Sequence, residues 1–318
     1  KLPLDIELRY GLSGSAQWHI GWDAFEIKKR KWGKPQPIQI KPAQFEVTIG
    51  ADDKHTTTVG SWDGWSLKEG SQQIDFGSIK IDTEGHRIGD FEHLWLNVGD
   101  VVLDGLTLKK HDKEVFAMGP IKIHGDGEPV ENNKRLNISS EVTVDYVKQK
   151  QDIVFNDGVF KLSMKGLDAA SLNRLAGVAR EAYKSGASSK VAQTALGLQL
   201  MGILPEMVSK GFTLSIDELS AEVMGNPVHF TMTAEIQQGA NIMAGMAALH
   251  KVSAVADCSV PRKLLMMLPG YNPEMIDAVI QQGFVKEENG VLKTHAEFKE
   301  MTLTLNGKPV PLPGLSGS

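Results

Sequence analysis

The side chains best able to carry chemistry in this sequence are nine histidines and one cysteine. The histidines are spread singly along the chain: His19, His55, His86, His93, His111, His124, His229, His250 and His295. No H-E-x-x-H run and no pair of histidines at helical spacing occurs, and these are the patterns that hold zinc on a helix. The sequence therefore predicts no metal site, and each histidine is interpreted as a surface or strand-face residue.

Nucleophile and nucleotide motifs are also missing. The run GLSGS at 11–15 fails the G-x-S-x-G pattern because Ser15 stands where the second glycine belongs. Cys258 lies on the apolar side of an alternating run, which indicates a buried, inert thiol. No glycine-rich phosphate loop joins a strand to a helix. We therefore predict a protein that is not an enzyme and needs no cofactor.

Two features rise above the background, and the first is aromatic. The six tryptophans all lie in the first third of the chain: Trp18, Trp22, Trp32, Trp62, Trp65 and Trp95. They could pack in a β core, or they could line a binding surface or contact a membrane interface. The sequence leaves both readings open.

The second feature is strict alternation of apolar and polar residues. Val228, Phe230, Met232, Ala234 and Ile236 fall on every second position of NPVHFTMTAEIQQ (226–238), with polar residues between them. A strand has a period of two, so this segment would have one apolar face and one polar face. The apolar face must lie against the protein's own core or against something that the protein binds.

Composition sets the broad class. The chain has 318 residues, of which 41% are hydrophobic and 23% charged, as in ordinary soluble proteins. A net charge of −5 argues against bulk electrostatic binding to nucleic acid or anionic lipid. A single cysteine excludes an intrachain disulfide. No run of 18 apolar residues is present, so no membrane span is predicted.

The order of patterns along the chain predicts one continuous, elongated domain. Residues 1–165 alternate almost throughout and are interpreted as antiparallel strands separated by Gly, Asp and Asn turns. Residues 166–318 continue as α+β: two helices within 168–209, further strands, short helices within 261–283 and a terminal β ribbon. Asp168 is a candidate N-cap, and Asn289-Gly290 and Asn306-Gly307 are candidate hairpin turns.

These elements predict an α+β fold with an extended, curved antiparallel sheet, a groove-like meander with helices packed on part of one face. The helices are too few to cover so long a sheet, and exposed apolar patches beyond roughly 300–600 Å² are rare on monomers. We therefore expect an apolar trough. The residues predicted to line it are Trp18, Trp22, Val228, Phe230, Met232 and Ile236.

Several junctions resemble those of the YdgA-like family of Gram-negative envelope proteins, whose domain has no known function. They are DGVFKLSMKGLDAASLNRLAG (157–177), GFTLSIDELSAEV (211–223), VPRKLL (260–265) and GVLKTHAEFKEMTLTLNGKPVPLP (290–313). The resemblance implies a periplasmic protein with an inner-membrane anchor in an N-terminal part that this chain, which opens without Met, lacks. It also implies a distant likeness to AsmA-like proteins, which use a long β-sheet with an apolar groove.

Two hypotheses follow. In the first, the protein binds a lipid or acyl chain along its apolar sheet face in envelope homeostasis. In the second, it is a structural or interaction module that acts through envelope proteins or through a second copy of itself. No nucleic-acid partner is expected.

Overall fold

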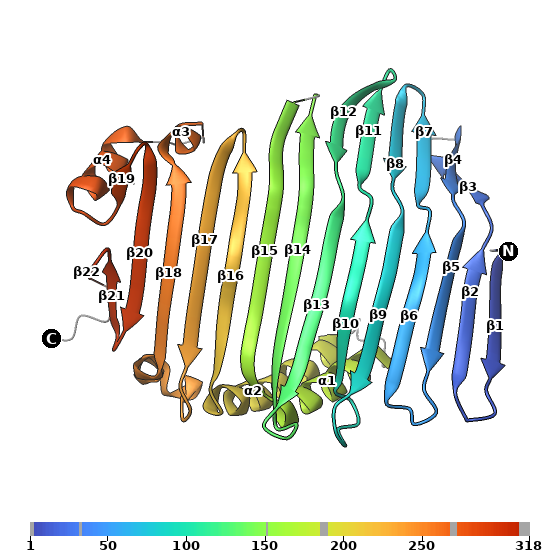
Figure 1. The fold of residues 1–318 in the computed structure, drawn as a ribbon, viewed down its shortest axis with the longest axis horizontal. Coiled ribbons are helices and arrows are strands. Elements are labelled where there is room, and N and C mark those ends of the chain that lie inside the picture. The colour runs from blue at the N-terminus through green and yellow to red at the C-terminus, as the bar shows by residue number, and fades with distance from the viewer. Residues whose placement is uncertain (1–2, 32–33, 151, 185–189, 268–271, 312–318) are drawn as a thin grey trace.

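A computed structural model describes residues 3–31, 34–150, 152–184, 190–267 and 272–311. Their main feature is one open antiparallel sheet of 22 strands. Figure 1 shows the strands following one another across the molecule, from the N-terminus at one side to the C-terminus at the other. The predicted fold class, an extended antiparallel sheet with a few helices, is confirmed.

The N-terminal half of the sheet consists of two rows of strands that lie end to end. The first row contains β1 (Leu4–Tyr10), β2 (Ala16–Trp22), β5 (Ala43–Ile49), β6 (His55–Trp62), β9 (Ile79–Arg87), β10 (Trp95–Leu103) and β13 (Ile121–Val130). The second row contains β3 (Phe25–Lys31), β4 (Lys34–Ile40), β7 (Trp65–Glu69), β8 (Gln72–Phe76), β11 (Leu106–Lys110) and β12 (Lys113–Met118).

The long strand β14 (Arg135–Gln149) closes both rows, because it pairs with β13 along most of its length and with β12 at its end. The sheet then continues as a single row of neighbouring strands. These are β15 (Asp152–Asp168), β16 (Phe212–Val223), β17 (Asn226–Ile236), β18 (Val252–Pro261), β20 (Val291–Lys299), β21 (Thr302–Leu305) and β22 (Lys308–Val310), with β19 (Lys286–Glu288) also beside β20.

A line of two-residue interruptions separates the two rows, and we call it the crease. At each interruption the flanking apolar residues are three positions apart: Trp22 and Phe25, Ile40 and Ala43, Trp62 and Trp65, Phe76 and Ile79, Leu103 and Leu106, and Met118 and Ile121. Backbone bonds cross the crease in pairs, such as Asp63 N to Pro42 O (2.9 Å) and Lys41 N to Gly64 O (3.0 Å). A proline fits at position 42 because only its carbonyl is required there.

The crease corrects part of the sequence interpretation. In the sequence, Ala24 continues the alternation of Trp18 and Trp22 and would extend their strand, but β2 ends at Trp22 and Ala24 lies in the interruption. The short phrases that begin at Asp104 and Lys210 look alike in sequence and have different places in the sheet. Gly105 lies in the crease, whereas Gly211 lies where α2 returns to β16.

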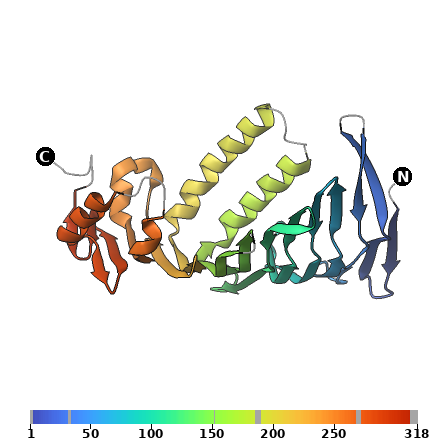
Figure 2. The same ribbon diagram turned by 90° about the horizontal axis from the view of Figure 1, so that it is seen from above.

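The helices form a small second layer. α1 (Ala169–Lys184) and α2 (Lys190–Ser209) lie side by side and project from one side of the sheet, as Figure 2 shows. Asp168 caps α1, since its Oδ2 accepts hydrogen bonds from Ser171 N and Ser171 Oγ, both at 2.8 Å. α2 runs past Pro205, which does not end it. The 3-10 helix η1 (Ile242–Lys251) was not expected, α3 (Arg262–Leu265) is only one turn, and α4 is Pro273–Gln281.

The buried core is small and lies under the first turn of α1. Its buried members are Ile88, Leu94, Leu96, Leu136 and Ala169, with Leu172 and Ile138 packed against them. The accessible surface is 19812 Å². Scaling from ordinary monomers of 34.7 kDa gives about 13,000 Å². The molecule exposes about half as much surface again because most of the sheet is a single layer.

Candidate functional site

The register of the strands separates apolar from charged side chains, because residues directly opposite one another project from the same face of a sheet. One row of partners crosses the sheet from β2 to β18: Ile20, Phe45, Gly60, Ile81, Val101, Ile123, Val142, Phe160, Leu219, Phe230 and Cys258. Apart from Gly60, every member is apolar or a thiol. We call the face that carries this row the apolar face.

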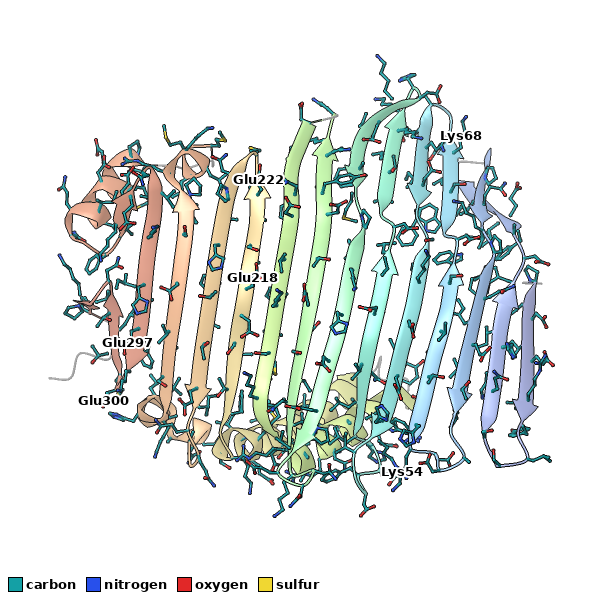
Figure 3. All side chains as sticks on the ribbon, in the orientation of Figure 1. Lys54, Lys68, Glu218, Glu222, Glu297 and Glu300 are labelled. Atoms are coloured by element: carbon teal, nitrogen blue, oxygen red, sulfur yellow. The ribbon has the colours of Figure 1, made fainter. Side chains whose placement is uncertain are left out.

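The opposite face carries a charged row at the intervening positions. Its members are Glu7, His19, Glu46, Val59, Asp82, Asp100, His124, Glu141, Lys161 and Glu218, the last of which is labelled in Figure 3. All but Val59 can be ionised. We call this face the polar face. The sheet is therefore amphipathic across nearly its whole width, not only within single strands.

The side chains of the apolar face are only partly covered. Phe230, Met232 and Phe160 are half-buried, although a packed core would bury them fully. Leu219 keeps 44% of its surface exposed and Ile123 keeps 43%. The helices cover one end of this face, since Leu172 of α1 packs against Ile138, whose partner on β15 is Met164.

The six residues predicted to line an apolar trough all lie on strands that carry this face. Trp18 and Met232 belong to one row of partners, which is apolar at Val47, Leu162 and Ile216 and consists of Thr, Ser and Gly between Val47 and Leu162. Trp22 and Ile236 lie two rows away from this row, on opposite sides of it, and Val228 lies opposite Ala221. However, nine strand steps separate β2 from β17, or about 43 Å at 4.8 Å per step. The tryptophans and the β17 residues are therefore two separate stretches of one face.

Strand pairing brings several aromatic residues together in a line beside the crease, an arrangement that the list of tryptophans alone did not predict. The ring centroid of Trp22 lies 6.1 Å from that of Phe45 and 6.4 Å from that of Trp62. The ring centroid of Trp62 lies 5.8 Å from that of Phe76. Both Trp22 Nε1 and Trp62 Nε1 donate to the carbonyl of Lys41. These tryptophans stabilise the crease with their polar edges and contribute ring surface to the apolar face. Trp32 lies outside the described residues.

The polar face is held by ion pairs between strands. Asp100 Oδ1 lies 3.2 Å from Lys122 Nζ and 3.0 Å from His124 Nδ1. The hydrogen bond from His124 is the main cause that lowers the pKa of Asp100. Glu218 pairs with Lys161 at 3.0 Å, and this contact lowers the pKa of Glu218. A hollow of about 790 Å³ on this side is lined by Glu7, Arg9, His19, Glu46, Asp82 and Asp100, among others. Its wall also includes Ile20, Phe45, Val59, Ile81 and Val102, so charged and apolar groups are mixed there.

In the part of the chain that the structure describes, no group of three His, Cys, Asp or Glu side chains is placed to hold a metal ion. Cys258 lies half-buried on the apolar face, where burial raises the pKa of its thiol and keeps it protonated. Among the described helices, none is both long enough and apolar enough to cross a membrane.

Fold and surface together define a class: a protein built on an open, amphipathic, single-layer sheet with a helical hairpin over one end of its apolar face. Within that class, the chain belongs to a family of bacterial proteins of unknown function (DUF945), whose model it matches over residues 1–313. This agrees with the resemblance found in the sequence. No curated protein matches the chain, and no solved structure does.

Proposed function

We propose that the protein binds the acyl chains of a lipid along its apolar sheet face. The observation that carries this proposal is the row from Ile20 to Cys258, which stays half-exposed and is not covered by a second sheet of the described residues. Leaving such a face in water costs about 25 cal/mol per Å², so an apolar occupant stabilises it. An acyl chain suits a broad surface that offers no specific polar contacts.

The proposal includes a place for the protein. The resemblance to envelope proteins supports a periplasmic location with an inner-membrane tether, where lipids are the most abundant apolar ligands. The likeness to AsmA-like sheets supports the same role in envelope homeostasis. Fractionation of cells that express the full gene product tests this part, and recovery of the protein in the cytoplasmic fraction would contradict it.

Native mass spectrometry after gentle extraction tests lipid binding directly. Phe230 and His229 are a matched pair, because they are neighbours on β17 and project from opposite faces. Phe230→Asp removes apolar contact worth about 1.5–3 kcal/mol, so retained lipid should fall by roughly tenfold or more. His229→Asp should retain lipid like the parent protein. Circular dichroism confirms the fold of each variant. A parent protein that stays lipid-free after repeated gentle extraction contradicts the proposal.

A second candidate function, an interaction module, is favoured by the N-terminal edge of the sheet. β1 is a seven-residue edge strand, and Leu4, Ile6 and Tyr10 on it are at least half-exposed. The other edge ends in β22, which has three residues including Pro309. Two β1 strands paired antiparallel about Glu7 would place Asp5 opposite Arg9 twice and Ile6 opposite Leu8, with the two Glu7 carboxylates as one unfavourable pair at the centre.

Light scattering tests this alternative. If β1 joins two copies, the parent protein is a dimer and Ile6→Pro gives a monomer, because proline removes a backbone donor and disrupts the edge. A monomeric parent protein at high concentration eliminates pairing through β1.

A further inference from the structure

The seam between α1 and the sheet contains a hollow of about 510 Å³ that the proposed function leaves unused. It is lined by Asp53, Arg87, Glu92, His93, Trp95, Ala176 and Arg180. Two contacts between His93 and α1 hold the helix beside the sheet at this hollow. His93 N donates to Asn173 Oδ1 of α1 at 2.9 Å. Gly177 lets the His93 ring approach the helix closely, since a Cβ at that position would lie 2.7 Å from His93 Cδ2.

Among the described residues, no ion pair joins Arg87 or Arg180 to a carboxylate, although Asp53 and Glu92 also line the hollow. Arg87 Nε is buried and has no hydrogen-bond partner among the described residues. Arg180 Nη1 lies 3.5 Å from His93 Nδ1, which is itself a basic group. The carboxylate of Glu92 is 3.8 Å from His93 Nδ1, and its side chain is 78% exposed. A buried donor without a partner needs an acceptor, and an anion would supply one.

A second hollow of about 320 Å³ adjoins the first and shares Trp95 with it. Its wall is mainly apolar and includes Leu94, Leu96, Leu136, Ile138 and Leu172. Ile138 stands in a row of partners with Met164 and Leu214, so this hollow opens at the end of the apolar face. A compartment that contains two arginines and an apolar compartment therefore lie next to each other beside α1.

We propose that the hollow at Arg87 and Arg180 binds the phosphate headgroup of an anionic amphiphile whose acyl chains lie on the apolar face. The inference rests on the proposed function for the acyl part and names the headgroup that goes with it. Phosphate is the preferred anion because two guanidinium groups can each offer it paired N–H donors in a fixed plane. Trp95 forms the boundary between headgroup and chain.

Calorimetric titration of the full chain tests the headgroup site with three probes: inorganic phosphate, a short-chain phosphatidic acid below its micelle concentration, and the diacylglycerol with the same chains. Arg87→Gln and Arg180→Gln should each weaken phosphatidic acid binding by roughly tenfold or more, since a charged hydrogen bond is lost. Diacylglycerol binding should not change. Arg174→Gln is the matched control, because Arg174 lies on the same helix and is paired with Glu206.

The outcomes separate this inference from the proposed function. Equal binding of phosphatidic acid and diacylglycerol, with no effect of either substitution, overturns the headgroup site and leaves the acyl site standing. Arginine-dependent binding of inorganic phosphate, with no binding of diacylglycerol, supports the anion site and contradicts the lipid. Arg180 is exposed on the surface of α1, so Arg180→Gln should fold, and circular dichroism checks this.

Discussion

Arg135 is the residue that fastens the helical hairpin to the sheet. Its guanidinium donates to the carbonyls of Gly211 at 2.9 Å, Lys210 at 2.7 Å and Gly166. Two of these carbonyls follow α2, and the third precedes α1. The side chain is 22% exposed, so Arg135→Ala would leave three carbonyls with little access to water.

We expect Arg135→Ala to lower the free energy of unfolding by about 2–3 kcal/mol. Arg135→Lys should recover only part of the loss, because an ammonium group cannot reach three separated carbonyls. Urea denaturation measures both variants. Arg9→Ala is the control, since Arg9 belongs to an exposed pair with Glu7, and solvent screens such a pair so that it contributes little to stability. A loss for Arg135→Ala no larger than that of the control would contradict the role.

Asp100 gives the polar face a dependence on pH. The hydrogen bond from His124, with help from Lys122, places the pKa of Asp100 below its ordinary value. A lowered pKa in the folded state means that Asp100 stabilises the fold above the unfolded pKa of about 3.9 and loses this contribution as pH falls through the folded value. Because the side chain is 40% exposed, the effect should be modest.

Denaturation midpoints measured from pH 6 to pH 2.5 test this expectation. Asp100→Asn should be less stable than the parent at pH 6 and should approach it below pH 4. A difference that stays constant over the whole range would show that the carboxylate charge does not matter.

At the scale of elements, the crease depends on glycines with positive φ. Gly64 has φ 90° and Gly105 has φ 114°. At each of them a Cβ would lie 2.1 Å from a carbonyl oxygen of the neighbouring strand, that of Phe76 or Met118. Alanine therefore adds backbone strain and a clash at either position.

Gly105→Ala should destabilise the protein by at least about 2 kcal/mol. Gly70→Ala is matched to it, since Gly70 has φ 57° and open space around its Cβ position, and it should cost about 1 kcal/mol. Thermal denaturation compares the two variants. If both variants lost the same stability, the close approach of strands at the crease would not be what requires glycine at position 105.

The elements that the sequence predicted well are those with strong local signals. Alternation revealed the strands because a single-layer sheet has faces of opposite character, as β17 shows. The pairs Asn289-Gly290 and Asn306-Gly307 do form turns with positive φ at both residues. The sequence did not predict which strands are neighbours. The crease divides the strands into two rows, so β3 pairs with β4 in one row while β2 pairs with β5 in the other.

The candidate site was predictable in one respect only. Alternation identified which residues share the apolar face, including Phe230 and Met232, but not how far apart the two predicted stretches lie. The hollow at Arg87 and Arg180 had no sequence signal at all, because the two arginines are brought together only when α1 folds back on the sheet. A shift of apolar residues by three positions, as between Trp62 and Trp65, was a sign of the crease that local reading missed.

The whole molecule resembles a repeat array, because each strand contacts mainly its neighbours and few contacts join distant parts. Stability in such a structure comes from successive interfaces between strands, so the ends can open without the middle. β14 and β15 have 15 and 17 residues, and they are the longest strands of the described sheet. They also join the double row to the single row and lie next to the buried core.

Hydrogen exchange should therefore be graded across the sheet. We expect amides of β1 and β22 to exchange fastest and those of β14 and β15 slowest, with intermediate rates between them. Mass spectrometry of peptides after timed exchange measures this. Added lipid should slow exchange in the strands that carry the apolar face, because an occupant on that face makes opening of a strand more costly. If all the strands exchanged together, the sheet would unfold as one unit, and the protection of single strands could not report where a ligand lies.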